Sequence, residues 1–186
     1  EEELLVNYHS KLIQCAAELL VSRYPKHLYP IASYCFQRGF YSQNMIVKSL
    51  TLDSLVWKKI NEYRVSKNVA PFNAFEYSDI RDYSYSVTTS NSKLEMIEHS
   101  GNNFHIYNIE CIYSWVKTYP DGFLDIIKVK DWEYLADDIV NSWIASPPHE
   151  IGISSDQFTK ATITTILTID SNADNYRLDA SYHGKY

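Results

Sequence analysis

The chain has 186 residues, of which 45% are hydrophobic, and a formal net charge of −6 at pH 7. This length suits one domain with an appendage, and the apolar fraction is sufficient for a sizeable core. There is no basic run and no stripe of lysine and arginine, which argues against nucleic acid as a partner. No apolar stretch is long enough to predict a transmembrane helix.

The cysteines give little functional signal. Cys15, Cys35 and Cys111 are widely spaced and form no C-x-x-C pair, which excludes a zinc ribbon or a thioredoxin-type motif. An odd count leaves at least one free thiol and leaves room for one disulfide. We expect all three to be small buried apolar side chains.

The first quarter of the chain predicts a helical hairpin. Helical periodicity runs through residues 3–23, and a shorter helix is expected over Ile31–Phe40, with Pro25 and Pro30 between the two. We interpret residues 1–52 as an N-terminal helical extension, which either packs on the main domain or forms a surface for a partner.

Two further helices are predicted before the first strand. Thr51 or Asp53 is expected to cap a helix that ends at Asn68–Pro71, and another helix is expected over Ser78–Thr88. A short helical piece is expected at Lys93–Glu98. Residues 104–115 then alternate between apolar and polar, which predicts a strand with Glu110 on the face opposite the aromatic stripe.

The clearest helix follows a turn at Asp121-Gly122. Asp131 is expected to cap it, and its apolar spacing runs without a gap until Pro147 and Pro148 stop it, with His149 just past the stop. Strands are then predicted at residues 161–169 and 176–183, joined by a polar turn at residues 170–175 and paired as a hairpin. This order predicts an α+β domain with helices covering a central antiparallel sheet.

Three residues are the candidates for chemistry, namely His99, Glu110 and His149. Histidine and carboxylate together can share protons near neutral pH or bind a divalent metal. The alternative is that they are unrelated surface and core residues. Ser100 beside His99 is expected to be a helix-end serine, because the G-x-S-x-G motif of a hydrolase is absent. The remaining histidines are expected to be isolated surface or core residues: His9, His27, His105 and His183.

The order of these signals resembles the CAP superfamily, which includes the cysteine-rich secretory proteins, antigen 5 and the plant pathogenesis-related proteins. The family's Asn-x-x-Arg pattern is similar to Asn61-Glu-Tyr-Arg64, and its histidine after a helix to His99. Its Gly-Glu-Asn-Ile motif is similar to Ile109-Glu-Cys-Ile112, with Glu110 in the glutamate place. The Trp-x-x-Ser-Pro-Gly-His pattern of bacterial single-domain members is similar to Trp143-Ile-Ala-Ser-Pro-Pro-His149.

The resemblance covers residues 53–186 and implies a CAP-like α-β-α sandwich with a central antiparallel sheet. It also implies that His99, Glu110 and His149 line one ligand-binding cleft, with His99 and His149 as candidate zinc ligands. The chain departs from the family where Ile109 and Pro148 replace glycines and Cys111 replaces asparagine. A second acidic residue of the family's site has no clear counterpart, with Glu133 and Glu150 candidates by type only.

Fold does not settle function in such a family. We expect a secreted or surface-exposed CAP-domain binding module, non-catalytic, that contacts a host or partner protein or a small apolar ligand such as a lipid or sterol. No cofactor is required, although the resemblance allows zinc. We expect a signal or lipid-anchor segment, as in a lipoprotein, to have been removed. The alternatives are a metal-dependent hydrolase using the His/Glu cleft and a structural component that assembles through the helical extension.

Overall fold

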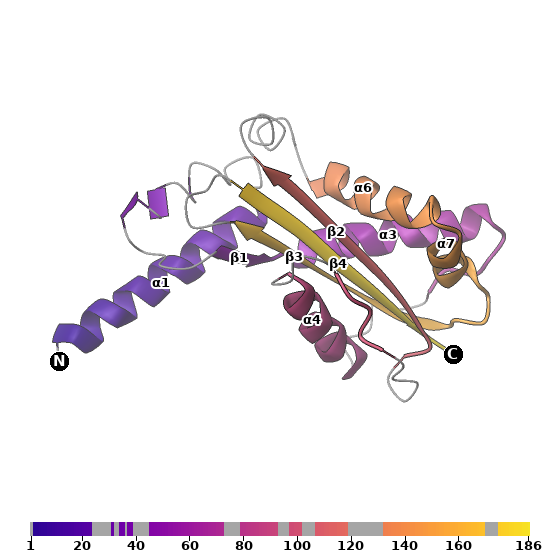
Figure 1. The fold of residues 1–186 in the computed structure, drawn as a ribbon, viewed down its shortest axis with the longest axis horizontal. Coiled ribbons are helices and arrows are strands. Elements are labelled where there is room, and N and C mark those ends of the chain that lie inside the picture. Colours follow the sequence, from indigo (N-terminus) through magenta and orange to yellow (C-terminus); the bar gives the residue numbers. More distant parts are fainter. Residues whose placement is uncertain are drawn as a thin grey trace.

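The structure, a computed structural model, describes residues 2–23, 31, 34–35, 37–38, 45–72, 79–92, 97–101, 107–118, 132–169 and 175–186. These residues form an α+β fold around a four-stranded antiparallel sheet in the order β1-β3-β4-β2 (Figure 1). The strands are β1 (Met45–Lys48), β2 (Ile109–Thr118), β3 (Lys160–Ile169) and β4 (Asn175–Lys185). The helices are α1 (Glu2–Arg23), α3 (Leu50–Ser66), α4 (Asp79–Asn91), α6 (Trp132–Ile144) and α7 (Pro147–Ser154).

One face of the sheet is apolar and holds the main core. Cys111 of β2 pairs with Tyr182 of β4, which in turn pairs with Ile163 of β3, and all three side chains are buried. Trp143 of α6 packs on Tyr182 with ring centroids 6.2 Å apart, and its indole N–H donates a 3.2 Å hydrogen bond to the Ile112 carbonyl. The uninterrupted apolar stripe predicted from the sequence therefore holds α6 against this face.

The opposite face of the sheet is polar, although it is equally buried. Thr164 of β3 bonds to Ser84 at 2.8 Å and to Thr88 at 2.7 Å, both on α4. The Thr88 hydroxyl also contacts Ser181 of β4 at 2.9 Å. Each of these four buried hydroxyls thus has a partner, which offsets the cost of taking it out of water. Helices consequently cover both faces, with a hydroxyl-rich contact layer under α4.

Helix α3 begins earlier than predicted. Ser49 is its N-cap and accepts a 3.2 Å hydrogen bond from the Leu52 N–H, so neither Thr51 nor Asp53 caps the helix. Asp53 is instead buried, and its carboxylate accepts bonds from the Thr165 N–H at 2.8 Å and from Arg81 at 2.7 Å. Its charge therefore ties α3 to β3 and α4.

The two prolines after α6 start a helix rather than a loop. Pro147 and Pro148 occupy the first two positions of α7, where the missing N–H groups cost nothing and the fixed φ suits a helix. His149 therefore lies past the end of α6, as predicted, and in the first turn of α7, a helix that was not predicted. Gly152 lets α7 approach β2 closely, because a Cβ atom there would lie 2.9 Å from the Ile109 side chain.

Strand β1 was not predicted at all. It pairs with β3 from Met45 opposite Ile169 to Lys48 opposite Ile166, so the sheet takes a strand from the segment that was interpreted as an extension. The boundary predicted between residues 52 and 53 falls inside α3. The division into residues 1–52 and 53–186 stays a prediction, while α1 confirms the helix expected over residues 3–23.

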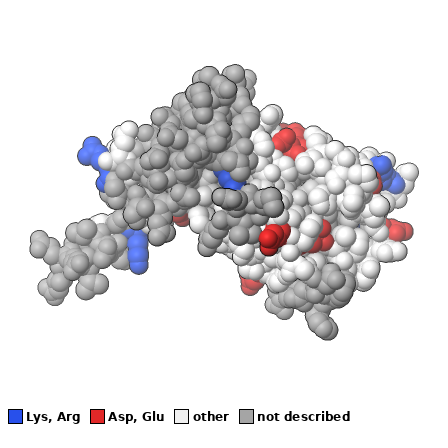
Figure 2. Space-filling model, viewed as in Figure 1, with Lys and Arg blue, Asp and Glu red and all other residues white. Residues whose placement is uncertain are grey.

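Several predicted features lie wholly or largely outside the described residues. They are the helix at Ile31–Phe40, the piece at Lys93–Glu98, the turns at residues 121–122 and 170–175, and the cap at Asp131. Within the described part, no helix is long and apolar enough to cross a membrane. On the face drawn in Figure 2, the described lysines and arginines are scattered and do not gather into a patch.

Candidate functional site

Glu110 is the centre of a hydrogen-bond cluster on the polar face of the sheet. Its side chain is 4% exposed and accepts four hydrogen bonds. His99 Nδ1 lies 2.7 Å from Oε2, and the Ser100 N–H donates to the same oxygen at 3.0 Å. The Ser100 hydroxyl and His183 Nε2 reach Oε1 at 2.5 and 2.8 Å. Strand β2 thus places the Glu110 carboxylate among four hydrogen-bond donors.

These donors keep the carboxylate charged. Burial raises the pKa of Glu110, but the hydrogen bonds from His183, Ser100 and His99 outweigh it and lower the pKa to about 2. A carboxylate with a pKa this low and with both oxygens engaged is a poor proton acceptor at neutral pH. The position of Glu110 therefore suits holding neighbouring side chains in place better than removing a proton from a substrate.

His183 is the residue of this cluster that the sequence did not predict. It lies directly opposite Glu110 in the β2–β4 ladder, it is fully buried, and Tyr107 packs on its ring with centroids 4.7 Å apart. Its Nδ1 atom has no hydrogen-bond partner among the described residues. The signal was present, because the alternation of β4 puts His183 on the polar side of its strand. The antiparallel register that pairs it with Glu110 was not deducible.

His99 and His149 lie beside one another at the surface end of the cluster. Their ring centroids are 6.3 Å apart, and the His99 side chain is 58% exposed. Burial and the neighbouring His99 lower the pKa of His149, so its ring is neutral at pH 7. The Cys111 thiol contacts the His149 carbonyl at 3.7 Å. The structure therefore brings all three sequence candidates together, and whether they bind a ligand stays a prediction.

Ser100 is not placed as a nucleophile. Its hydroxyl donates to Glu110 and contacts the Tyr107 hydroxyl at 2.9 Å, and neither contact involves a histidine ring. The Tyr107 hydroxyl also donates to the Gly101 carbonyl. A serine nucleophile needs a base that can accept its proton, and here Ser100 donates to a carboxylate that holds its charge. The residue is not at a helix end either, since residues 97–101 are irregular.

The two surface histidines do not by themselves fit a zinc centre. His99 offers only Nε2, because Nδ1 faces Glu110, and His149 offers one more ring nitrogen. Across the described part of the chain, no group of three or more histidine, cysteine or acidic side chains is placed to hold a metal ion. Structural zinc usually has four protein ligands and catalytic zinc three, so a pair of imidazoles falls short of both.

The Asn61 and Arg64 pattern is structural. The Asn61 side-chain oxygen accepts a 2.8 Å hydrogen bond from the Phe72 N–H, which fixes the chain after α3. Arg64 is 2% exposed and donates to four backbone carbonyls at 2.9 to 3.1 Å, with its guanidinium 3.8 Å from the Phe72 ring centroid. The carbonyls belong to Ala70, Ile153, Ser155 and Phe158. This one side chain joins α3 to the segment between α7 and β3.

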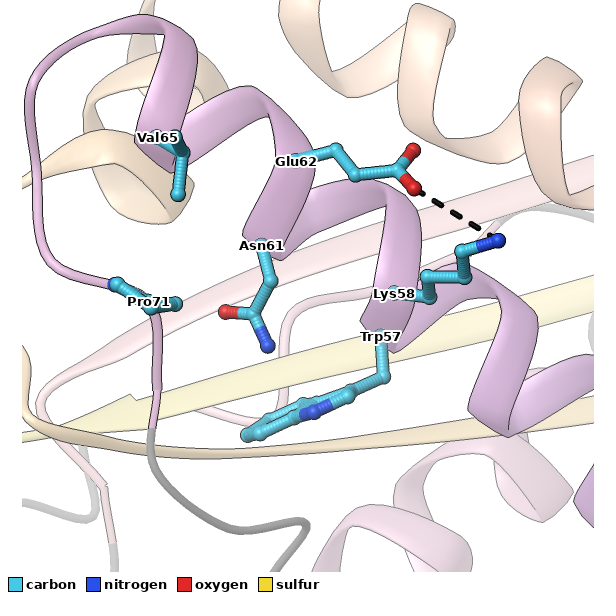
Figure 3. A pocket seen from close by; sticks show the side chains of 6 residues that line it. All are labelled: Trp57, Lys58, Asn61, Glu62, Val65 and Pro71. Carbon is cyan, nitrogen blue, oxygen red and sulfur yellow. Dashed lines mark ion pairs between the residues drawn. The ribbon is translucent and has the colours of Figure 1, made fainter.

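A separate hollow of about 500 Å³ lies along α3 (Figure 3). Trp57 and Asn61 point from the helix toward the segment that carries Pro71, and Val65 lies beside them. Lys58 and Glu62 form an ion pair at its edge, with 3.7 Å between Nζ and Oε1. The floor is therefore apolar, with one amide and one charge pair at the margin.

The free cysteines differ in exposure. All three are unpaired, and Cys35 and Cys111 are buried as expected, whereas Cys15 on α1 is exposed. Burial raises the pKa of the Cys111 thiol, with the neighbouring Glu110 charge adding to the shift, so this thiol is unreactive at neutral pH. The prediction that all three are buried is wrong for Cys15.

Comparison with known proteins gives little to add. No family model matches the chain, and no curated protein matches it. A solved structure, that of an outer surface protein from Borrelia burgdorferi, aligns with a TM-score of 0.42 and 13% identity over 75% of this chain and 96% of that one. A likeness at this level carries no argument about the function of this chain.

Proposed function

We propose that this protein is a non-catalytic binding module of the CAP type, exported or exposed at a cell surface. It binds a small apolar ligand, such as a lipid or sterol, or a host or partner protein. The observation that carries the proposal is the state of Glu110, the acidic residue that a hydrolase would use. Its two oxygens accept four hydrogen bonds and its pKa lies at about 2.

The hollow along α3 supports the choice of an apolar ligand. The hollow is open to solvent, and its lining is mostly apolar with a few polar groups, which is the composition of sites that bind small apolar molecules. Trp57, Val65 and Pro71 supply the apolar wall, and Asn61 lies among them. The Asn61 oxygen is engaged by the Phe72 N–H, and its amide N–H groups have no hydrogen-bond partner among the described residues. An acyl chain or ring system with one acceptor oxygen matches this wall.

Replacing Val65 by glutamate is expected to weaken binding of a dansylated undecanoic acid probe at least about tenfold, because the bound chain would have to desolvate the added charge. The new carboxylate also repels the carboxylate of the probe. Val65 is 57% exposed, so the fold should tolerate the substitution. Dansyl fluorescence during titration of the intact chain measures the affinity.

Leu50→Glu is the matched control. Leu50 is equally exposed at 58% and lies at the other end of the same helix, about 22 Å away at 1.5 Å per residue. The control should bind the probe like the wild-type chain. Equal binding by both variants would show that the probe does not bind in this hollow. No binding by the wild-type chain up to about 100 µM, a free energy near −5.5 kcal/mol, would reject a fatty-acid ligand.

The second candidate function is a metal-dependent hydrolase at His99, Glu110 and His149. The closeness of the two histidine rings, whose centroids are 6.3 Å apart, favours it, and the His99 side chain is exposed. The ligand count argues against it, so we expect Zn²⁺ to bind weakly if it binds. The assay that separates the two functions is turnover of a peptide library.

A further inference from the structure

Helix α1 carries a seam of apolar side chains at coiled-coil spacing. Its members follow one another at intervals of 3, 4, 3 and 4 residues: Leu5, Tyr8, Leu12, Cys15 and Leu19. This is the a/d pattern of a heptad repeat, which places every member on one stripe of the helix. A partner that covers such a seam removes its apolar surface from water, which favours association.

Three members of the seam have exposed side chains. Leu12 is 57% exposed, Leu19 is 54% exposed, and Cys15 between them is exposed as well. Ala17, on the opposite side of α1, is buried, and α1 packs against β1 and α3. Figure 1 shows the N-terminal half of α1 extending away from the sheet. The helix thus attaches by the side that carries Ala17, while Leu12, Cys15 and Leu19 on the other side are exposed.

We propose that the seam pairs with the same seam of a second copy of this chain, with the two α1 helices antiparallel. A self-complementary patch of this kind forms a closed twofold dimer. The charges beside the seam favour this partner. Lys11 and Glu18 flank the same edge of the seam, one heptad apart. An antiparallel alignment places Lys11 opposite Glu18 of the second copy, and twofold symmetry repeats the pair.

A parallel alignment lacks this match. It sets Lys11 beside Ala16 of the second copy, which carries no charge. Antiparallel pairing also puts the two domains at opposite ends of the helix pair, where the extended half of α1 leaves room for each. The dimer contact is on α1 and the apolar hollow on α3, so this inference stands independently of the proposed ligand.

Sedimentation velocity of the full chain over about 1 to 100 µM, the range of weak reversible association, tests the pairing. The wild-type chain is expected to dimerise, and Leu12→Glu to remain monomeric because two charges would enter the seam. Ile151→Glu, at a side chain that is 62% exposed on α7, is the matched control and should dimerise like the wild type. Thermal unfolding of both variants confirms that they are folded. A wild-type monomer throughout the range, or an equal loss in both variants, overturns the proposal.

Charge reversal tests the orientation. Lys11→Glu is expected to raise the dimer dissociation constant about fivefold, since two exposed ion pairs become two repulsions. Adding Glu18→Lys should restore it, because each reversed residue again faces its opposite. Glu18 also lies near Lys48 of its own chain, so the double variant is compared with Glu18→Lys alone. Failure to restore the dimer, or a Cys15–Cys15 disulfide in the oxidised dimer, contradicts the antiparallel arrangement.

A membrane is the competing occupant of the seam. Flotation with vesicles of phosphatidylcholine and phosphatidylglycerol decides between the two. The proposal expects the wild-type chain to stay out of the vesicle fraction. Flotation that Leu12→Glu abolishes, combined with a monomer in sedimentation, would assign the seam to lipid and reject the second copy.

Discussion

Replacing Arg64 by methionine is expected to lower the free energy of unfolding by about 3 to 5 kcal/mol. The guanidinium donates to four backbone carbonyls, and methionine of similar length fills the space but donates nothing. The carbonyls of Ile153 and Phe158 belong to buried residues, so the loss leaves acceptors without partners away from water. Urea denaturation at pH 7 measures the change.

Two further variants separate the hydrogen bonds from the charge and the bulk. Arg64→Lys keeps the charge, but one ammonium cannot reach four acceptors in a planar fork, so most of the loss should remain. Lys58→Met on the same helix removes an exposed ion pair and should change stability by less than about 1 kcal/mol. Wild-type stability in Arg64→Met would show that the hydrogen bonds of Arg64 do not hold α3 to the segment before β3.

Glu110→Gln is expected to lower the free energy of unfolding by about 3 kcal/mol at pH 7. It should also abolish the part of the pH dependence of stability that comes from Glu110. An amide offers one acceptor oxygen where the carboxylate offers two, so two of the donors from His99, Ser100 and His183 lose their partner. The folded-state pKa of Glu110 is about 2, below the usual value of 4.5. The stability it supplies is therefore complete above pH 4.5 and is lost as the pH falls toward 2.

Urea denaturation of both proteins from pH 7 to pH 2 tests this account. The difference between wild type and Glu110→Gln should be constant above pH 4.5 and should shrink below it. Glu62→Gln is the control, because its carboxylate is 61% exposed and pairs with the exposed Lys58. A gap that stays constant down to pH 2 would show that the charge of Glu110 contributes nothing.

Regular periodicity made part of the fold predictable. The apolar stripe of α6 and the alternation of β3 and β4 are visible in the sequence, because each element buries one face. Strand β1 was missed because a four-residue segment offers too little alternation to recognise. Helix α7 was missed because two prolines were taken as a stop, although proline is equally suited to the first turn of a helix.

The site was predictable only in part. The resemblance indicated His99, Glu110 and His149, and the structure places them together. His183 was expected to be an isolated histidine, because alternation puts it on the polar side of its strand but does not show which residue it faces. Its role depends on the register that sets it opposite Glu110, which is a long-range property of the sheet. The apolar hollow was also not predicted, because it depends on how the chain turns back toward Val65 after α3 ends.

The most direct test of the central claim, that this protein is a non-catalytic binding module, is turnover of a broad peptide library by the intact chain with and without added Zn²⁺. Catalysis needs a nucleophile or metal-bound water and a base that can accept a proton, and Glu110 is committed to its four donors. The predicted result is no cleavage above the buffer rate in either condition. Cleavage by the wild-type chain that Glu110→Gln and His149→Ala both abolish while remaining folded would contradict the claim and establish a hydrolase.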